Sequence, residues 1–126
     1  MDRKKRILVK EDDDIVRTII AKLAGRRGVE VVNAPDGREA IKLIQLGSHF
    51  DAIFLDLLMP NASGWDVLDV IQEQPSAKDT PVVILSGAPV SPRERNKLRS
   101  KVTAFMDKET FTISDFEALI DRLLGK

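Results

Sequence analysis

The chain has 126 residues, and 20 Lys+Arg balance 20 Asp+Glu to give a formal net charge of zero. This length suits one domain of ordinary size, and the absence of cysteine excludes disulfides, zinc–thiolate sites and thiol nucleophiles. Balanced charge argues against direct nucleic-acid binding. No apolar stretch approaches the roughly 18 residues that a membrane helix needs, so we expect no membrane association and a cytoplasmic location.

The zero net charge conceals a segregation of charge along the chain. Residues 1–10 and 93–101 each carry five bases and one acid, so the rest of the chain has a net charge of −8. We interpret residues 1–6 as a solvated basic leader. The acidic groups must therefore gather elsewhere in the fold.

Five short runs rich in β-branched or aromatic residues predict five strands, at 7–9, 29–32, 52–55, 82–85 and 102–106. The runs 7–9, 52–55 and 82–85 are continuously apolar. Such runs are typical of central strands that helices cover on both faces of a parallel sheet.

Helical patterns follow each strand. The first has an apolar face of Val16, Ile19, Ile20 and Leu23 and closes at Gly25. The others begin at polar capping residues, namely Asp36, Ser63, Ser91 and Ser114. In the last helix Glu117 follows the cap by three residues, and the predicted buried face is Phe116, Leu119, Ile120 and Leu123.

The fourth helical pattern is unusually basic. From Pro92 to Lys101 it offers only Leu98 as a clear apolar anchor. A helix that is polar nearly all round gains little from packing and is expected to be mobile. A charge run of this kind is either a solvated face or an electropositive surface that meets an acidic partner.

Strands that alternate with helices predict a (βα)₅ fold of class α/β: a doubly wound, five-stranded parallel sheet in a three-layer α/β/α arrangement. We expect residues 1–126 to form a single domain with no output domain. In such folds the binding groups lie in the crevice beyond the carboxyl ends of the strands.

Polar residues follow four of the predicted strands. The first is followed by the run Glu11, Asp12, Asp13 and Asp14, the third by Asp56, the fourth by Ser86 and the fifth by Lys108. Carboxylates crowded together raise one another's pKa unless a cation lies among them, and Mg²⁺ accepts carboxylate, water and phosphate oxygens. A carboxylate, a hydroxyl and an ammonium group around Mg²⁺ suit phosphoryl transfer, with Asp56 as the nucleophile.

The segment from Asp51 to Leu68 resembles the receiver domain of two-component response regulators. The resemblance rests on Met59-Pro60 after Asp56 and on Gly64 before the third helix, together with the acidic pair, Ser86 and Lys108 in matching register. It implies the flavodoxin-like strand order 2-1-3-4-5. It also implies a phosphoprotein of two-component signalling, whose phosphoryl donor is a histidine kinase or a histidine phosphotransfer protein.

The same resemblance implies the site residues. Asp12 and Asp56 would bind Mg²⁺ directly, Glu11 through water, and Leu58 through its backbone carbonyl; whether Asp13 joins them stays open. Asp56 would accept the phosphoryl group, Ser86 would hydrogen-bond it and Lys108 would pair with it. The domain would catalyse its own phosphorylation and dephosphorylation without being a conventional turnover enzyme.

A switch would then pass the signal on. Ser86 and Phe105 are the implied switch residues, and the implied output surface comprises the fourth helix, the fifth strand and the fifth helix. That surface would contact a downstream protein or an output domain, or would form a phosphorylation-dependent dimer.

Two departures from the family pattern keep alternatives open. Glu109 follows Lys108 where the family usually has a cis-bonded Pro, so we predict that the bond between them is trans, or cis with strain. Phe105 stands where Tyr is frequent and lacks a hydroxyl. These departures suggest, as an alternative, a receiver-like interaction module that does not depend on phosphorylation. A Mg²⁺-dependent phosphatase is disfavoured, because Leu58 lies where its second Asp would stand.

Overall fold

The computed structural model describes residues 4–57, 63–87 and 90–125. Its strands form one parallel sheet, as the sequence pattern predicted, in the order β2-β1-β3-β4-β5 that the family resemblance implied. The strands are β1 Arg6–Lys10, β2 Glu30–Ala34, β3 Ala52–Asp56, β4 Val82–Ser86 and β5 Ala104–Asp107. The predicted central strands β1, β3 and β4 occupy the middle of the sheet, where helices cover both faces.

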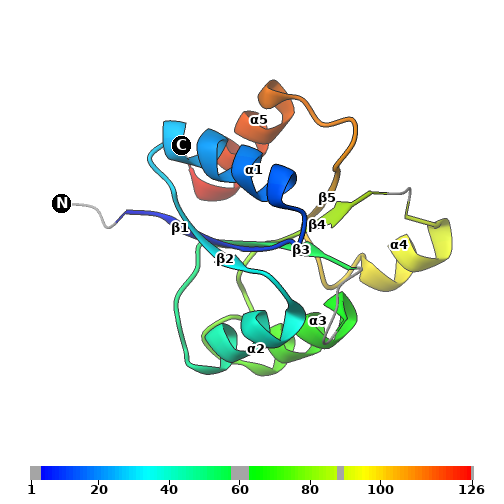
Figure 1. Ribbon diagram of the computed structural model, residues 1–126. Helices are drawn as coiled ribbons and strands as arrows, with labels where there is room; N and C mark the ends of the chain where they lie inside the picture. Colours follow the sequence, from blue (N-terminus) through cyan, green and yellow to red (C-terminus); the bar gives the residue numbers. More distant parts are fainter. Residues whose placement is uncertain (1–3, 58–62, 88–89, 126) are drawn as a thin grey trace.

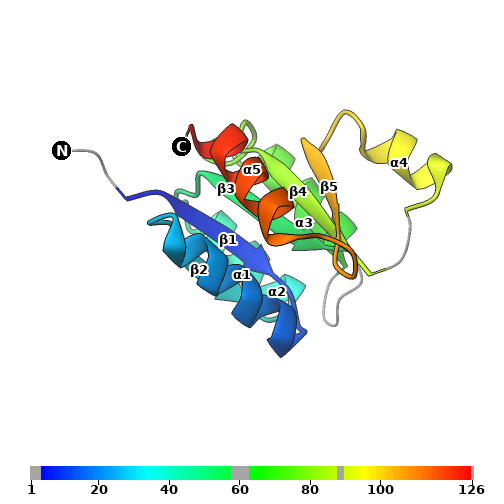
Figure 2. The same ribbon diagram turned by 90° about the horizontal axis from the view of Figure 1, so that it is seen from above.

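Five helices alternate with the strands and make the outer layers (Figure 1). They are α1 Asp14–Arg26, α2 Gly37–Gln45, α3 Gly64–Glu73, α4 Pro92–Leu98 and α5 Ile113–Leu124. Helices α1 and α5 cover one face of the sheet and α2 and α3 the other, as Figure 2 shows from a second direction. Helix α4 is the shortest. Within the described ranges no helix combines the length and apolar character needed to cross a membrane.

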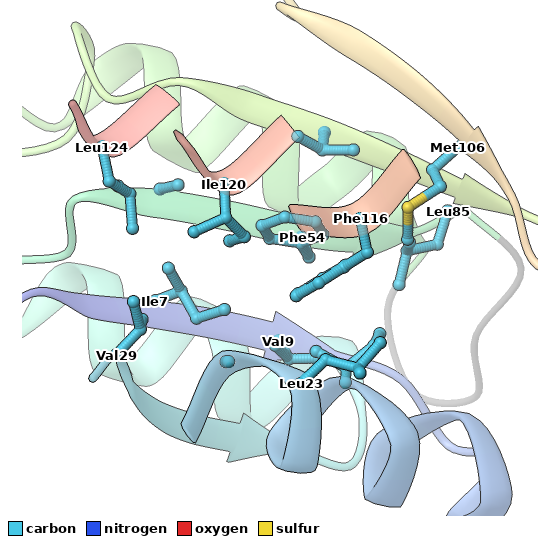
Figure 3. Close-up of a cluster of buried hydrophobic side chains, with 14 residues drawn as sticks. Ile7, Val9, Leu23, Val29, Phe54, Leu85, Met106, Phe116, Ile120 and Leu124 are labelled. Atoms are coloured by element: carbon cyan, nitrogen blue, oxygen red, sulfur yellow. The ribbon is translucent and has the colours of Figure 1, made fainter. Parts of the chain in front are cut away.

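Each face of the sheet has its own hydrophobic core. Under α1 and α5, Phe54 and Phe116 lie with ring centroids 5.7 Å apart, surrounded by side chains such as Ile7, Val9 and Ile120 (Figure 3). On the other face, Leu8 packs with apolar residues of α2 and α3, and Leu98 of α4 is fully buried there. Leu98 is therefore the apolar anchor of α4, as predicted.

Several element ends differ from the predicted ones. Strand β5 begins at Ala104 rather than 102, and α4 ends at Leu98 rather than Lys101. The prediction that Ser114 and Glu117 open the last helix is wrong. Thr112 caps it and forms a reciprocal capping box with Asp115. Both pairs have the capping-box spacing, and only Thr112 has extended backbone where the chain turns into the helix.

The predicted apolar face of α1 is wrong at Ile19. Ile20 and Leu23 are buried beneath the helix, whereas Ile19 is 40% exposed. Ala24 takes the third buried position instead. Apolar residues at helical spacing predict a stripe, but the part of the stripe that is buried depends on how α1 packs against the sheet and against α5 beside it (Figure 1 and Figure 2).

Candidate functional site

The predicted site residues meet at the carboxyl ends of the strands. Glu11 directly follows β1, Asp56 ends β3, Ser86 ends β4 and Lys108 directly follows β5. These four strands are neighbours in the sheet, in the order β1-β3-β4-β5. Parallel pairing therefore brings groups that are up to 97 residues apart in the chain into direct contact.

Three carboxylates form a compact cluster at this edge. Ligand oxygens of Glu11, Asp12 and Asp56 all lie within 4.8 Å of one another. Glu11 is fully buried and Asp56 is 5% exposed, while Asp12 faces solvent. A hard divalent cation suits this set, because its charge offsets the repulsion and the exposed side leaves room for water or phosphate oxygens. The donor set therefore fits Mg²⁺.

Lys108 bridges the two buried carboxylates. Its Nζ donates to Asp56 Oδ2 at 2.8 Å and to Glu11 Oε2 at 2.9 Å, and it lies 2.8 Å from Glu11 Oε1. Burial opposes the ammonium charge, but hydrogen bonds and attraction from Asp56 and Glu11 outweigh it and raise the pKa of Lys108. Burial raises the pKa of Glu11, although Lys108 partly opposes that shift. The ammonium group thus offsets part of the carboxylate charge.

A second cation lies next to the cluster, and the sequence analysis did not single it out. Lys10, the last residue of β1, is fully buried. Burial lowers its pKa, whereas Asp56, Asp12, Glu11 and Asp36 favour its charged form. The alternation of side chains along the strand could have identified it. In the strand Arg6–Lys10, Lys10 falls on the same face as buried Leu8, where an apolar residue is expected.

The acidic run is divided between the cluster and the start of α1. Asp13 caps α1, since its side chain accepts the backbone N–H groups of Ile15 and Val16. Its own N–H donates to Glu11 Oε2 at 3.0 Å. The described cluster comprises Glu11, Asp12 and Asp56, and the Asp13 N–H holds one oxygen of the Glu11 carboxylate.

Gly64 holds the segment after Asp56 close to the start of α3. A Cβ on Gly64 would lie 2.6 Å from Leu57 Cα and 2.9 Å from the Asp56 carbonyl oxygen. The Gly64 N–H donates to the Leu57 carbonyl at 3.2 Å. Ser63 and Asp66 form the predicted capping box that fixes this end of α3. The close approach requires a residue without a side chain.

The two predicted switch residues lie on neighbouring strands. Ser86 is half-buried, and its carbonyl accepts the Lys108 N–H at 2.8 Å. Phe105 is half-buried in β5, and the Arg95 guanidinium carbon lies 4.4 Å from its ring centroid. This cation–π contact connects β5 to the basic helix α4.

The structure tests the loop after β5 but not the loop after β3. No cis peptide bond occurs in the described ranges, so the bond between Lys108 and Glu109 is trans, as predicted. Leu58, Met59 and Pro60 lie outside the described residues. The predicted metal contact through the Leu58 carbonyl therefore stays a prediction.

Apolar side chains are exposed at the starts of α1 and α5. Ile15 is 72% and Ile113 is 52% exposed. A groove between α1 and the start of α5 is lined by Ile19, Ile113 and other residues, and it includes Lys108. Lys108 therefore connects the groove with the acidic cluster, because it contacts both Glu11 and Asp56.

Residues 7–121 match the model of the response regulator receiver domain. Among curated proteins, the chain is 28% identical to the two-component response regulator ORR3 of Oryza sativa over 95% of its length and 91% of that protein. It is 34% identical to the 3',5'-cyclic-nucleotide phosphodiesterase regA of Dictyostelium discoideum. That match covers 74% of the chain but only 12% of the enzyme.

Solved structures agree in fold. The N-terminal domain of a response regulator receiver protein from Methanoculleus marisnigri JR1 is 26% identical, with a TM-score of 0.75 and coverage of 96% of this chain and 97% of that one. The receiver domain of the sensor histidine kinase PA1611 from Pseudomonas aeruginosa PAO1 has a TM-score of 0.85. It is 21% identical, covers 98% and 100% of the two chains, and holds a magnesium ion in its active-site cleft.

Proposed function

The chain belongs to the response regulator receiver domain family, and from that premise we propose that it accepts a phosphoryl group from a phosphohistidine onto Asp56. One observation carries the proposal. The Asp56 carboxylate is 5% exposed, lies 2.8 Å from the Lys108 ammonium group and shares a cluster with Glu11 and Asp12. A nucleophile beside a cation and a set of metal ligands suits phosphoryl transfer.

Mg²⁺ is the proposed cofactor. Glu11, Asp12 and Asp56 would hold it, with the Leu58 carbonyl as the predicted backbone ligand. When bound, the ion neutralises charge on the carboxylates and on the phosphoryl oxygens. The chemistry of the donor set supports this choice, and a relative of the same fold carries magnesium in its cleft.

The reaction exchanges one bond to phosphorus for another. An Asp56 carboxylate oxygen attacks phosphorus and the P–N bond breaks. The electron pair of that bond stays with the donor's ring, which carries a proton on its other nitrogen and so departs as neutral imidazole. Lys108, which pairs with Asp56 in this structure, would then pair with a phosphoryl oxygen. The Ser86 hydroxyl would donate a hydrogen bond to another. Most of the catalysis would consist of placing charge and holding the reacting atoms in position.

The donor, a histidine kinase or a histidine phosphotransfer protein, must reach over the acidic cluster. Exposed Ile15 and Ile113 lie at the starts of α1 and α5, and the groove between these helices includes Lys108, which contacts the cluster. An apolar surface of the donor packed here would bring its phosphohistidine to Asp56. We therefore place the donor contact on this side of the molecule.

The output contact would lie on α4, β5 and α5, so that only the start of α5 is shared with the proposed donor surface. Phosphorylation would draw the Ser86 hydroxyl toward the phosphoryl group and let the Phe105 ring turn inward. The Arg95 contact with Phe105 would couple that movement to α4. The basic residues of α4 favour an acidic downstream partner.

The experiment compares the wild-type chain with Asp56→Asn. Each is incubated with Mg²⁺ and a small-molecule phosphodonor, and its intact mass is measured. We expect the mass of one phosphoryl group on the wild type and none on Asp56→Asn. Asp79→Asn, which changes an exposed carboxylate away from the site, should be modified like the wild type.

The alternative is a receiver-like module that works without phosphorylation. Glu109 after Lys108 favours it, because this residue departs from the family pattern next to a site residue. No mass gain on the wild type, and no spectral response to beryllofluoride, would support this alternative and contradict the phosphoacceptor role.

A further inference from the structure

Lys10 occupies a core position that the proposed reaction does not use. Its side chain is fully buried and is the largest such side chain among the described residues. Its Nζ has no hydrogen-bond partner within the described part of the chain. Lysine is rarely buried completely unless it is paired, because the ammonium group loses its hydration. A residue that serves only to fill this space would be apolar.

The backbone fixes the position of Lys10 in the sheet. Its register partners are Ala34 on β2 and Leu55 on β3, both fully buried. The side chain of Lys10 is fully buried at this end of β1, so its ammonium group is removed from solvent. A positive charge here lies in the interior of the protein, beside the residues that follow β1 and end β3.

The charges around Lys10 are those of the proposed metal site. Asp56 acts on it most strongly, followed by Asp12 and Glu11, and then by Asp36, which caps α2. In their ionised forms, the three carboxylates and Lys108 together have a net charge of −2, and the ammonium group of Lys10 reduces it to −1. A divalent ion that enters the cluster is thus repelled by a second, buried cation.

We propose that Lys10 is an internal counter-cation that weakens divalent-ion binding at the Glu11, Asp12 and Asp56 site and stabilises this cluster when no metal is bound. The inference rests on the proposed function, since it takes the cluster as the metal site. Repulsion is strong here because the intervening medium is protein rather than water. Lys10 thereby sets the concentration of Mg²⁺ at which the site fills.

The test removes the charge with side chains of similar shape. Met and Gln are both neutral, lack a β branch and are about one atom shorter than lysine, so either Lys10→Met or Lys10→Gln serves if the other does not fold. Mg²⁺ is titrated into each purified protein by calorimetry. We expect the dissociation constant of Mg²⁺ to fall by about tenfold relative to wild type. Lys42→Met removes an exposed lysine of α2, where solvent screens the charge, and should leave the constant unchanged.

A second measurement uses stability. Because ligand binding stabilises the folded state, added MgCl₂ should raise the melting temperature of Lys10→Met more than that of the wild type. Equal or weaker Mg²⁺ binding by folded Lys10→Met would overturn the inference, as would a failure of both the wild type and Lys10→Met to bind Mg²⁺. Phosphorylation of Asp56 is tested separately, by the mass gain of the wild-type protein, so failure of the inference can be distinguished from failure of the proposed function.

Discussion

Replacement of Gly64 by alanine tests how closely α3 must approach the phosphoacceptor segment. The new Cβ would lie 2.6 Å from Leu57 Cα and 2.9 Å from the Asp56 carbonyl oxygen, both of which belong to the backbone. Carbon atoms in contact are about 3.5–4.0 Å apart, so one of the two segments must move by about 1 Å. Such overpacking costs about 1–3 kcal/mol of unfolding free energy. It also displaces Asp56, and a misplacement of about 1 Å can slow a chemical step by about 100-fold.

The assay measures denaturant unfolding and the rate of phosphorylation by a small-molecule donor. Gly25→Ala is the control, since Gly25 lies within α1, has ordinary backbone angles and has no atom within 4 Å of an added Cβ. Alanine should stabilise that helix by about 0.5–1 kcal/mol and leave the rate unchanged. If Gly64→Ala matched the wild type in both stability and rate, the argument from close approach would be refuted.

Two further predictions concern the base of the sheet and the proposed donor surface. Burial alone would raise the pKa of Asp51, but hydrogen bonds from the Arg6 N–H and from His49 lower it below the ordinary value for aspartate. The ionised carboxylate therefore stabilises the folded state fully above the pKa of the unfolded chain, and this stabilisation is lost as pH falls through the lower pKa of the folded state. Asp51→Asn should lower the unfolding free energy by about 1 kcal/mol at neutral pH, with the difference closing in acid, as denaturant titrations across pH would show. Ile15→Ser should slow transfer from a phosphohistidine protein about tenfold without changing small-molecule phosphorylation. Leu46→Ser, equally exposed at 72%, should change neither rate, and equal slowing by both variants would contradict the proposed donor surface.

Local features of the fold could be predicted because they depend on neighbours in the chain. The apolar runs predicted the central strands, and the caps at Asp36, Ser63 and Ser91 lie where their spacing placed them. The cap of α5 was misplaced by two residues. Ser114 and Thr112 have equally suitable side chains, and the path of the loop after β5 decides between them.

The sequence by itself determined which chemical groups follow which strands, because strand periodicity and the positions of Glu11, Asp56, Ser86 and Lys108 can be read along the chain. Only the tertiary structure decided what these groups contact. It paired Lys108 with both Glu11 and Asp56, left Ile19 partly exposed and buried Lys10 beneath the acidic cluster. The physical reason is that pairing energies and desolvation depend on distances across the sheet, which the order of residues does not specify.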